Sequence, residues 1–281
     1  MAVSLDLTAF AASHDILAIG MAADDERRRL HGARTTFVRV AEVAAEPGAP
    51  VVVPAAAGEV RIVGTPGTRS AARRRIGEVV KAAGGVPVSA CSLADLERLS
   101  AEEQVTLRAL LEELRAEGLD LIAEAPFDRL QDPRRSIEEV NIAGLALARL
   151  TIDQVPPLDV LSHFGQIAEL QRAVAVVRTF APLPRRVNPA LPTTGYDDVK
   201  RIALARLAVR NVPSIQVDWA LYGPKLAQVA LTVGADDVDG VSASDESPDG
   251  RRRSPLEEIL RNIRAAGLEP LERDGRFELR A

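Results

Sequence analysis

The sequence predicts an α/β fold: a parallel TIM-type (β/α)6–8 barrel, complete or nearly closed, with an N-terminal helix. Two observations support this prediction. Short runs rich in β-branched residues alternate along the chain with longer amphipathic segments, the pattern of successive βαβ units and a parallel sheet. Six to eight such units fit a chain of 281 residues, and no glycine-rich dinucleotide turn follows any strand, which disfavours an open doubly wound sheet.

The elements follow in order from the hydrophobic pattern. In "ILAIGMAADDERRRLHG" apolar residues recur at helical spacing, and Gly32 can end that helix. Strands are expected at Thr35–Val40, Glu59–Gly64, Val86–Cys91, Leu119–Glu124, Pro156–Phe164, Pro213–Trp219 and Ala235–Gly240. Helices are expected at Thr68–Ala83, Ala101–Glu117 and Asp197–Val209. We expect one domain over residues 1–281, with a helical extension at 1–33 and a mobile loop at 242–255, where the sequence is polar and contains Pro and Gly.

Charge and composition exclude several classes of function. The net charge of −5 is made of interspersed signs, so no nucleic-acid footprint or polybasic membrane surface is expected. The basic clusters Arg27–Arg29, Arg73–Arg75 and Arg251–Arg253 are interpreted as solvated surface. No apolar run has the length of a membrane span, and the first residues lack the basic region of a signal peptide, so we expect a cytoplasmic protein. One cysteine excludes an internal disulfide.

The segment "TTGYDDVKRIALARLAVRNVPSIQVDWALYGPKLAQVALTVGADDVDG", Thr193–Gly240, strongly resembles the aminofutalosine synthase branch of the radical S-adenosylmethionine (SAM) enzymes. The resemblance extends with gaps over nearly the whole chain. "HDILAIGMAADDERRRLHGARTTFV" is similar to the family's helix and first barrel strand, and "EVRIVGTPGT", "VPVSACSLADLERL" and "SHFGQIAE" are similar to later strand regions. The resemblance implies a radical-SAM-type barrel and a place in the futalosine route to menaquinone.

The same resemblance exposes what this chain lacks. Relatives hold a [4Fe–4S] cluster on a CxxxCxxC loop after the first barrel strand, where this chain reads "RVAEVAAEPGAPVVVPAAAGEV". Cys91 alone cannot supply three thiolate ligands. Where relatives have Tyr-Gly-His, this chain has Phe164-Gly165-Gln166, and the glycine-rich segment after the fourth strand is "AEAPFDR". We therefore expect no [4Fe–4S] cluster and no other metal or cofactor, and SAM binding is doubtful.

Several residues are candidates for a ligand site at the barrel mouth. Gln216 and Asp218 alternate onto one face of a predicted strand, and polar residues near the inner C-terminal end of barrel strands commonly bind ligands. His163 and Cys91 lie near the ends of predicted strands, with packing roles as the alternatives. Gly64 stands where relatives place glycines near the SAM methionyl group.

The acidic residues Asp236, Asp237 and Asp239 form a further candidate group. Acidic clustering is compatible with a divalent cation, but we interpret these residues as acceptors for loop amides and helix N-termini. No P-loop, HExxH or CxxC motif occurs, and no catalytic residue can be assigned.

Two classes of function follow. The first is a cluster-less pseudoenzyme: a non-catalytic partner or stabiliser in menaquinone biosynthesis, forming a hetero-oligomer with a cluster-bearing radical SAM relative, or a homodimer. The second is a cluster-independent enzyme or binder that holds a nucleoside-like or aromatic acid ligand at the barrel mouth. The sequence favours the first, because the loops that carry chemistry in barrel enzymes are the most altered.

Overall fold

A closed parallel barrel forms the centre of the molecule, which we describe from a computed structural model covering residues 6–154, 159–190, 192–246 and 254–280. Eight parallel strands of this part of the chain close the ring, because β1 pairs with both β2 and β9. Their bounds are β1 (Arg34–Ala44), β2 (Glu59–Val63), β3 (Val88–Ser92), β4 (Leu121–Pro126), β6 (Leu150–Ile152), β7 (Thr179–Pro184), β8 (Ser214–Asp218) and β9 (Asp237–Ser242). Two further strands, β5 (Ala146–Leu147) and β10 (Glu269–Arg273), pair with β4 and β1. The predicted barrel is confirmed.

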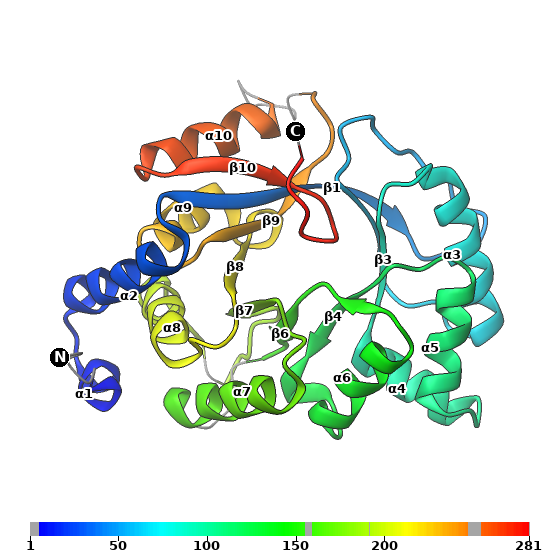
Figure 1. The fold of residues 1–281 in the computed structure, drawn as a ribbon, viewed down its shortest axis with the longest axis horizontal. Helices are drawn as coiled ribbons and strands as arrows, with labels where there is room; N and C mark the ends of the chain where they lie inside the picture. Colours follow the sequence, from blue (N-terminus) through cyan, green and yellow to red (C-terminus); the bar gives the residue numbers. More distant parts are fainter. Residues whose placement is uncertain (1–5, 155–158, 191, 247–253, 281) are drawn as a thin grey trace.

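Helices surround the ring of strands (Figure 1). Their bounds are α1 (Leu7–Ala12), α2 (Ile16–His31), α3 (Arg69–Ala83), α4 (Leu93–Glu102), α5 (Leu107–Ala116), α6 (Pro133–Ile142), α7 (Val160–Val174), α8 (Gly195–Ala208), α9 (Trp219–Leu231) and α10 (Pro255–Ala265). A short 3₁₀ turn, η1 (Phe127–Arg129), follows β4. The predicted N-terminal helix corresponds to α2, which packs on α8 and ends at Gly32, where φ is +63°. The predicted pairing of the last two barrel strands is also correct, because β8 and β9 are parallel neighbours.

The prediction of a strand at Pro156–Phe164 is wrong. Residues 155–158 lie outside the described part, and Val160 begins helix α7. The apolar residues Val160, Phe164 and Ile167 recur at helical spacing, and Asp159 caps the helix by accepting a 3.0 Å hydrogen bond from the backbone N–H of Ser162. Part of the Ser242–Pro255 loop, residues 247–253, also lies outside the described part.

The single helix expected over Ala101–Glu117 is two helices. Helix α4 ends at Glu102, and Gln104 adopts a left-handed conformation with φ of 55°. Thr106 then begins α5 by accepting a 3.2 Å bond from the Ala109 backbone N–H. A left-handed non-glycine residue stops helical hydrogen bonding, so the amphipathic pattern continues while the helix does not.

The interpretation of the basic clusters as solvated surface is wrong for two of their arginines. Arg27 and Arg75 are fully buried. Arg75 donates to the carbonyl oxygens of Ala44 and Ala49 at 2.8 and 2.9 Å and so anchors the segment that follows β1. A guanidinium group has five N–H donors, which suits it to bind several carbonyls at once. Arg251–Arg253 lie outside the described residues.

Candidate functional site at the barrel mouth

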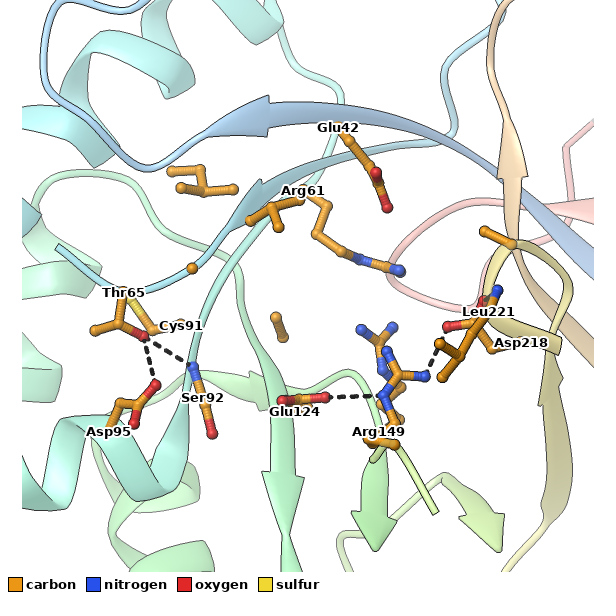
Figure 2. Close-up of a pocket in the computed structure, with 16 residues that line it drawn as sticks. Glu42, Arg61, Thr65, Cys91, Ser92, Asp95, Glu124, Arg149, Asp218 and Leu221 are labelled. Carbon is orange, nitrogen blue, oxygen red and sulfur yellow. Dashed lines mark hydrogen bonds and ion pairs between the residues drawn. The ribbon is translucent and has the colours of Figure 1, made fainter. Parts of the chain in front are cut away.

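A cavity of about 400 Å³ opens at the carboxyl ends of the barrel strands (Figure 2). Strands β1, β2, β3, β4 and β8 supply residues to its wall, as do the residues just before β6 and just after β7, and the first turn of α9 covers one side. The charged lining residues are Glu42, Arg61, Asp95, Glu124, Arg149, Arg185 and Asp218. Barrel enzymes hold their ligands at this end, and the volume lies within the range of small-molecule sites.

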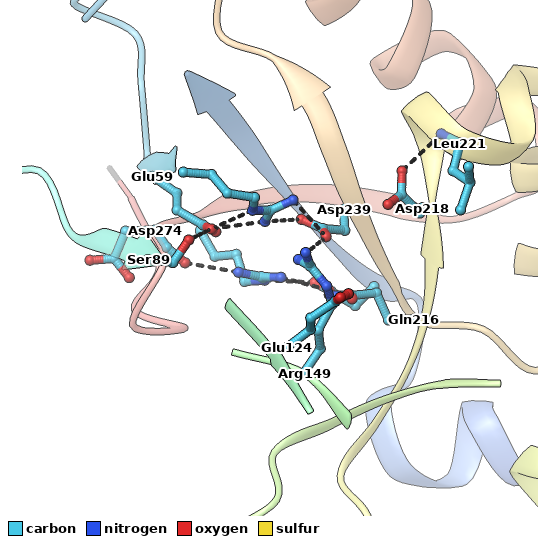
Figure 3. A network of polar contacts seen from close by, with 12 residues as sticks. Glu59, Ser89, Glu124, Arg149, Gln216, Asp218, Leu221, Asp239 and Asp274 are labelled. Carbon is cyan, nitrogen blue, oxygen red and sulfur yellow. Dashed lines mark hydrogen bonds and ion pairs between the residues drawn. The ribbon is translucent and has the colours of Figure 1, made fainter. Parts of the chain in front are cut away.

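Asp239, on β9, lies behind the cavity wall and holds two of its arginines in place. Its carboxylate accepts hydrogen bonds from Arg61 at 2.8 and 3.1 Å and forms an ion pair with Nη1 of Arg149 (Figure 3). Although burial alone would raise the pKa of Asp239, the guanidinium groups of Arg149 and Arg61 lower it well below its ordinary value. Asp239 is therefore ionised and fixes both arginines in the wall of the cavity.

Arg149 is the arginine of the cavity that uses the fewest of its donors. It is only 4% exposed and its ion pair with Asp239 is shared with Arg61, while its Nε has no hydrogen-bond partner. Burial, followed by repulsion from Arg61, lowers the pKa of Arg149. A buried guanidinium that uses so few of its donors gains from an anion that enters the cavity.

Arg185, just after β7, is held by acids from two other strands. It donates a 2.7 Å bond to Asp218 and lies 3.5 Å from a carboxylate oxygen of Glu124. Asp218 also caps α9 by accepting a 3.0 Å bond from the Leu221 backbone N–H (Figure 3). Gly240 leaves room for this arrangement, because a Cβ there would stand 2.8 Å from Oδ1 of Asp218.

Of the residues proposed from the sequence, Asp218, Cys91 and Gly64 line the cavity. Gln216 shares the inward face of β8 with Asp218 but lies one layer deeper, where its side-chain N–H donates to Asp237 at 2.6 Å. Asp237 also receives two 2.7 Å bonds from Arg273. Gln216 therefore belongs to the polar interior of the barrel and not to the wall of the cavity.

Cys91 lines the cavity but is 2% exposed. Its backbone is left-handed, with φ of 64°, an uncommon conformation for a residue other than glycine. Burial raises the pKa of its thiol to about 12, so the sulfur is protonated near neutral pH. Gly64, with φ of +92°, lies on the same side of the cavity.

His163 lies on the first turns of α7 and not at a strand end, which corrects the placement expected from the sequence. Its ring is buried and meets Phe127 edge to face at 5.4 Å between ring centroids. Burial, followed by the charge of Arg201, lowers the pKa of His163. It does not line the mouth cavity.

The interpretation of Asp236, Asp237 and Asp239 as acceptors for loop amides and helix N-termini is largely wrong. Each forms an ion pair with buried arginine: Asp236 with Arg206, Asp237 with Arg273, and Asp239 with Arg61 and Arg149. One backbone bond fits the expectation, from Ile215 N–H to Asp236 at 2.9 Å. Arginine is the natural partner because its planar donors match a carboxylate.

The residues of this mouth do not fit an iron–sulfur cluster. The chain has one cysteine, and that thiol is buried and protonated near neutral pH. Residues 45–58, between β1 and β2, contain no Cys or His. In the described part of the chain, no three His, Cys, Asp or Glu side chains are placed to hold a metal ion. Thiolates are the ligands that such clusters need.

The arginines that shape this site were missed by sequence reasoning. One signal was present: Glu59 and Arg61 alternate with Val60 and Ile62 on β2, which places two charged residues on one face of a barrel strand. Arg149 and Arg185 carry no comparable signal, because each stands next to a strand that was not predicted.

The fold and the site together define a class: a (β/α)8 barrel with charged groups converging at the carboxyl ends of its strands. Solved structures share this fold. Methylornithine synthase aligns with a TM-score of 0.64 over 94% of this chain and 93% of its own, at 12% identity. The hydrogenase maturase HydG aligns with a TM-score of 0.62 over 95% of this chain and 71% of its own, at 10% identity.

Sequence comparisons narrow the class. Residues 181–281 match the family model of the CofH/MqnC C-terminal region. Aminodeoxyfutalosine synthase of Thermus thermophilus is 29% identical over 230 residues, 69% of this chain and 60% of its own length. The Streptomyces coelicolor protein of the same name is 38% identical over 92 residues, 31% of this chain and 24% of its own.

The C-terminal part of the chain therefore matches a family of futalosine-pathway proteins, and the chain is similar to the aminofutalosine synthases, in agreement with the resemblance found in the sequence. The chain spans 60% of the length of the Thermus relative and a smaller share of the Streptomyces one. No helix of the described residues is both long and apolar enough to cross a membrane.

Proposed function

We propose that this chain is a cluster-independent homologue of aminofutalosine synthase that binds a small carboxylate-bearing ligand at its barrel mouth. The proposal rests on the cavity of about 400 Å³, because its wall contains the buried guanidinium of Arg149, whose Nε has no hydrogen-bond partner. Sequence reasoning placed a non-catalytic partner first. Because of the cavity, we place the ligand-binding role before the partner role. A subunit that only stabilises another protein does not need charged groups that converge in a cavity of ligand size.

A carboxylate fits the donors of this mouth. Arg149 and Arg185 both border the cavity, and paired N–H groups of a guanidinium bind carboxylates in a fixed, planar geometry. Between the charged groups lie Ile62, Val63 and Leu221, which offer contact to an apolar body. Such a ligand is an aromatic or similarly compact acid, the second of the two ligand types expected from the sequence.

Support for the metabolic setting comes from the relatives. Proteins similar to this chain are named aminodeoxyfutalosine synthase and cyclic dehypoxanthine futalosine synthase, the latter from Streptomyces coelicolor at 24% identity over 66% of this chain. We therefore assign the chain to the futalosine route to menaquinone, in the cytoplasm. It acts there without a [4Fe–4S] cluster or SAM, since one protonated, buried thiol cannot ligate the cluster.

Two measurements test the proposal. Anaerobic reconstitution with iron and sulfide should give no stoichiometric cluster absorbance. Binding of about four irons per chain, retained after Cys91→Ser, would overturn cluster independence.

The second measurement is a calorimetric titration, which should detect binding of benzoate but not of its uncharged methyl ester. Arg149→Gln should weaken benzoate binding about tenfold or more, the worth of a charge-assisted hydrogen bond.

Arg206→Gln is the matched control. Like Arg149, Arg206 is a buried arginine paired with one aspartate, but it bonds Asp236 and the Gly234 carbonyl away from the cavity. It should reduce stability and leave benzoate affinity unchanged. Equal loss of binding in both variants would mean that Arg149 acts through folding alone.

A non-catalytic partner remains the second candidate, and one surface feature favours it. Leu17 and Met21 stand one turn apart on α2 and are 75% and 69% exposed. Exposed apolar side chains on one helix face suit contact with another chain, such as a cluster-bearing radical SAM relative or a second copy. Light scattering of the protein alone and mixed with that relative tests this; a complex lost in Leu17→Ser would favour the partner role.

A further inference from the structure

Glu42 differs from every other charged residue of the mouth. It lies near the end of β1 and its carboxylate points into the cavity (Figure 2). It makes no hydrogen bond or ion pair with any residue that the structure describes, whereas the other six charged lining residues are all paired. A carboxylate left free where all its neighbours are paired is available to a ligand.

The charges of the cavity are also unbalanced toward acid. Its lining contains four carboxylates, Glu42, Asp95, Glu124 and Asp218, against three guanidinium groups, a difference of one. Asp239 adds a further negative charge directly behind the cavity wall. A ligand that brought only a carboxylate would enlarge this imbalance in a partly desolvated space, where like charges repel strongly. A ligand with an additional positive group would reduce it.

Glu42 is placed to receive such a group at a distance from the arginines. It borders a second cavity of about 330 Å³, and that cavity shares Glu42 and Ala220 with the first. The two cavities therefore adjoin each other at Glu42. Arg149, the residue just before β6, lies across the mouth from Glu42 (Figure 2).

We propose that Glu42 determines ligand specificity by binding an ammonium group, and that the ligand is a zwitterion with its carboxylate and ammonium at opposite ends of a compact apolar spacer. This inference rests on the carboxylate site proposed above. Arg149 orients the anionic end, and Glu42 selects for the cationic end.

A set of matched benzoates tests this by calorimetry. The probes are 3- and 4-(aminomethyl)benzoate, and the corresponding methylbenzoates and hydroxymethylbenzoates, which keep the carboxylate but carry an uncharged substituent in place of the ammonium. One aminomethyl isomer should bind about tenfold tighter than its methyl counterpart, the effect of one charge-assisted pair. The hydroxymethyl compound, whose substituent is polar but uncharged, should bind with an affinity between those two. Adding salt should reduce the difference, since Glu42 is exposed to solvent.

Glu42→Gln should abolish the preference for the ammonium, and affinity for the methylbenzoates should not fall, because the substitution also removes the repulsion between Glu42 and their carboxylate. Because Glu42 has no partner in the described chain, this variant should melt at the wild-type temperature. Glu169→Gln, at a 74% exposed position on α7, is the control and should change neither property. Arg149→Gln should weaken all the benzoates together.

The outcomes are distinguishable. Methyl and aminomethyl compounds binding equally, with Arg149 still required, would refute the role of Glu42 and leave the carboxylate site standing. An ammonium preference that survives Glu42→Gln would also refute it. Failure of every benzoate to bind would refute both the carboxylate site and the zwitterion.

Discussion

Asp239→Asn should be among the most damaging single substitutions in the barrel. The carboxylate is 1% exposed and accepts bonds from Arg61 at 2.8 and 3.1 Å while also pairing with Arg149. Asparagine keeps one acceptor oxygen but loses the charge and turns an N–H group toward two cations. Arg61 retains Glu59 at 2.8 Å, but Arg149 loses its ion pair. Removing one partner of a buried ion pair costs about 3–5 kcal/mol.

For a chain of this size, that cost corresponds to a fall in melting temperature of about 5–8 °C. Urea denaturation followed by circular dichroism measures the free energy directly. Glu138→Gln is the control, since Glu138 forms an exposed 2.9 Å pair with Arg134 on α6, where about 0–1 kcal/mol is expected. A loss below about 1 kcal/mol for Asp239→Asn would refute our account of the buried network.

The sign of the pH dependence follows from the lowered pKa of Asp239. A carboxyl group with a lowered pKa in the folded state stabilises the protein above its unfolded pKa of about 3.9. That stabilisation is lost as pH falls toward the folded value. The free-energy difference between wild type and Asp239→Asn should therefore be constant near neutral pH and shrink progressively below about pH 4. A difference that grows under acid would contradict the assignment.

Three other substitutions or reagents probe the neighbourhood of the mouth. Cys91, with its pKa raised to about 12 and 2% exposure, should resist a thiol-specific disulfide reagent at pH about 8 and react once urea unfolds the chain; rapid native labelling would show an open thiol. Trp219→Ala should cost about 3–5 kcal/mol, because the indole is 7% exposed, and a neutral result by urea titration would disprove its packing role. Gly240→Ala should cost about 1–3 kcal/mol, because φ is +71° and the new methyl would meet Asp218 at 2.8 Å; an unchanged melting temperature would contradict this.

The strands that were predicted correctly are those whose sequence alternates between polar and apolar residues in step with the two faces of the barrel wall. Glu59–Gly64 and Pro213–Trp219 alternate visibly between the two faces of a barrel strand, and they correspond to β2 and β8. The missed strands lack that signal. Strand β6 has three residues, and β7 contains Pro182 and Pro184, which disfavour a strand assignment.

The candidate site was predictable only in part, for a different reason. Alternation along one strand placed Asp218 on the inward face, and the position of Cys91 at the end of a predicted strand made it a candidate for the mouth. The ion pairs themselves join residues far apart in sequence: Arg149 and Asp239 are 90 positions apart, and Arg61 and Asp239 are 178. No spacing rule connects such residues before the barrel closes, so the charged character of the mouth is a property of the fold.

The interior of this barrel supports a functional account of its charges. Barrel interiors are ordinarily filled with branched apolar side chains. Here the registered pairs Gln216–Asp237 and Asp218–Asp239 place polar groups in successive layers, each joined to buried or half-buried arginine. Replacing buried ion pairs with well-packed apolar residues is often neutral or stabilising, so folding stability alone does not account for retaining these layers.

The polar layers do supply a fixed arrangement of charges at the mouth. Asp239 holds Arg149 and Asp218 holds Arg185 in the cavity wall, and Glu42 alone is left unpaired among the charged lining residues that the structure describes. An interior built in this way presents converging donors and one free acceptor to an incoming molecule, which is the requirement for binding a ligand that carries both charges.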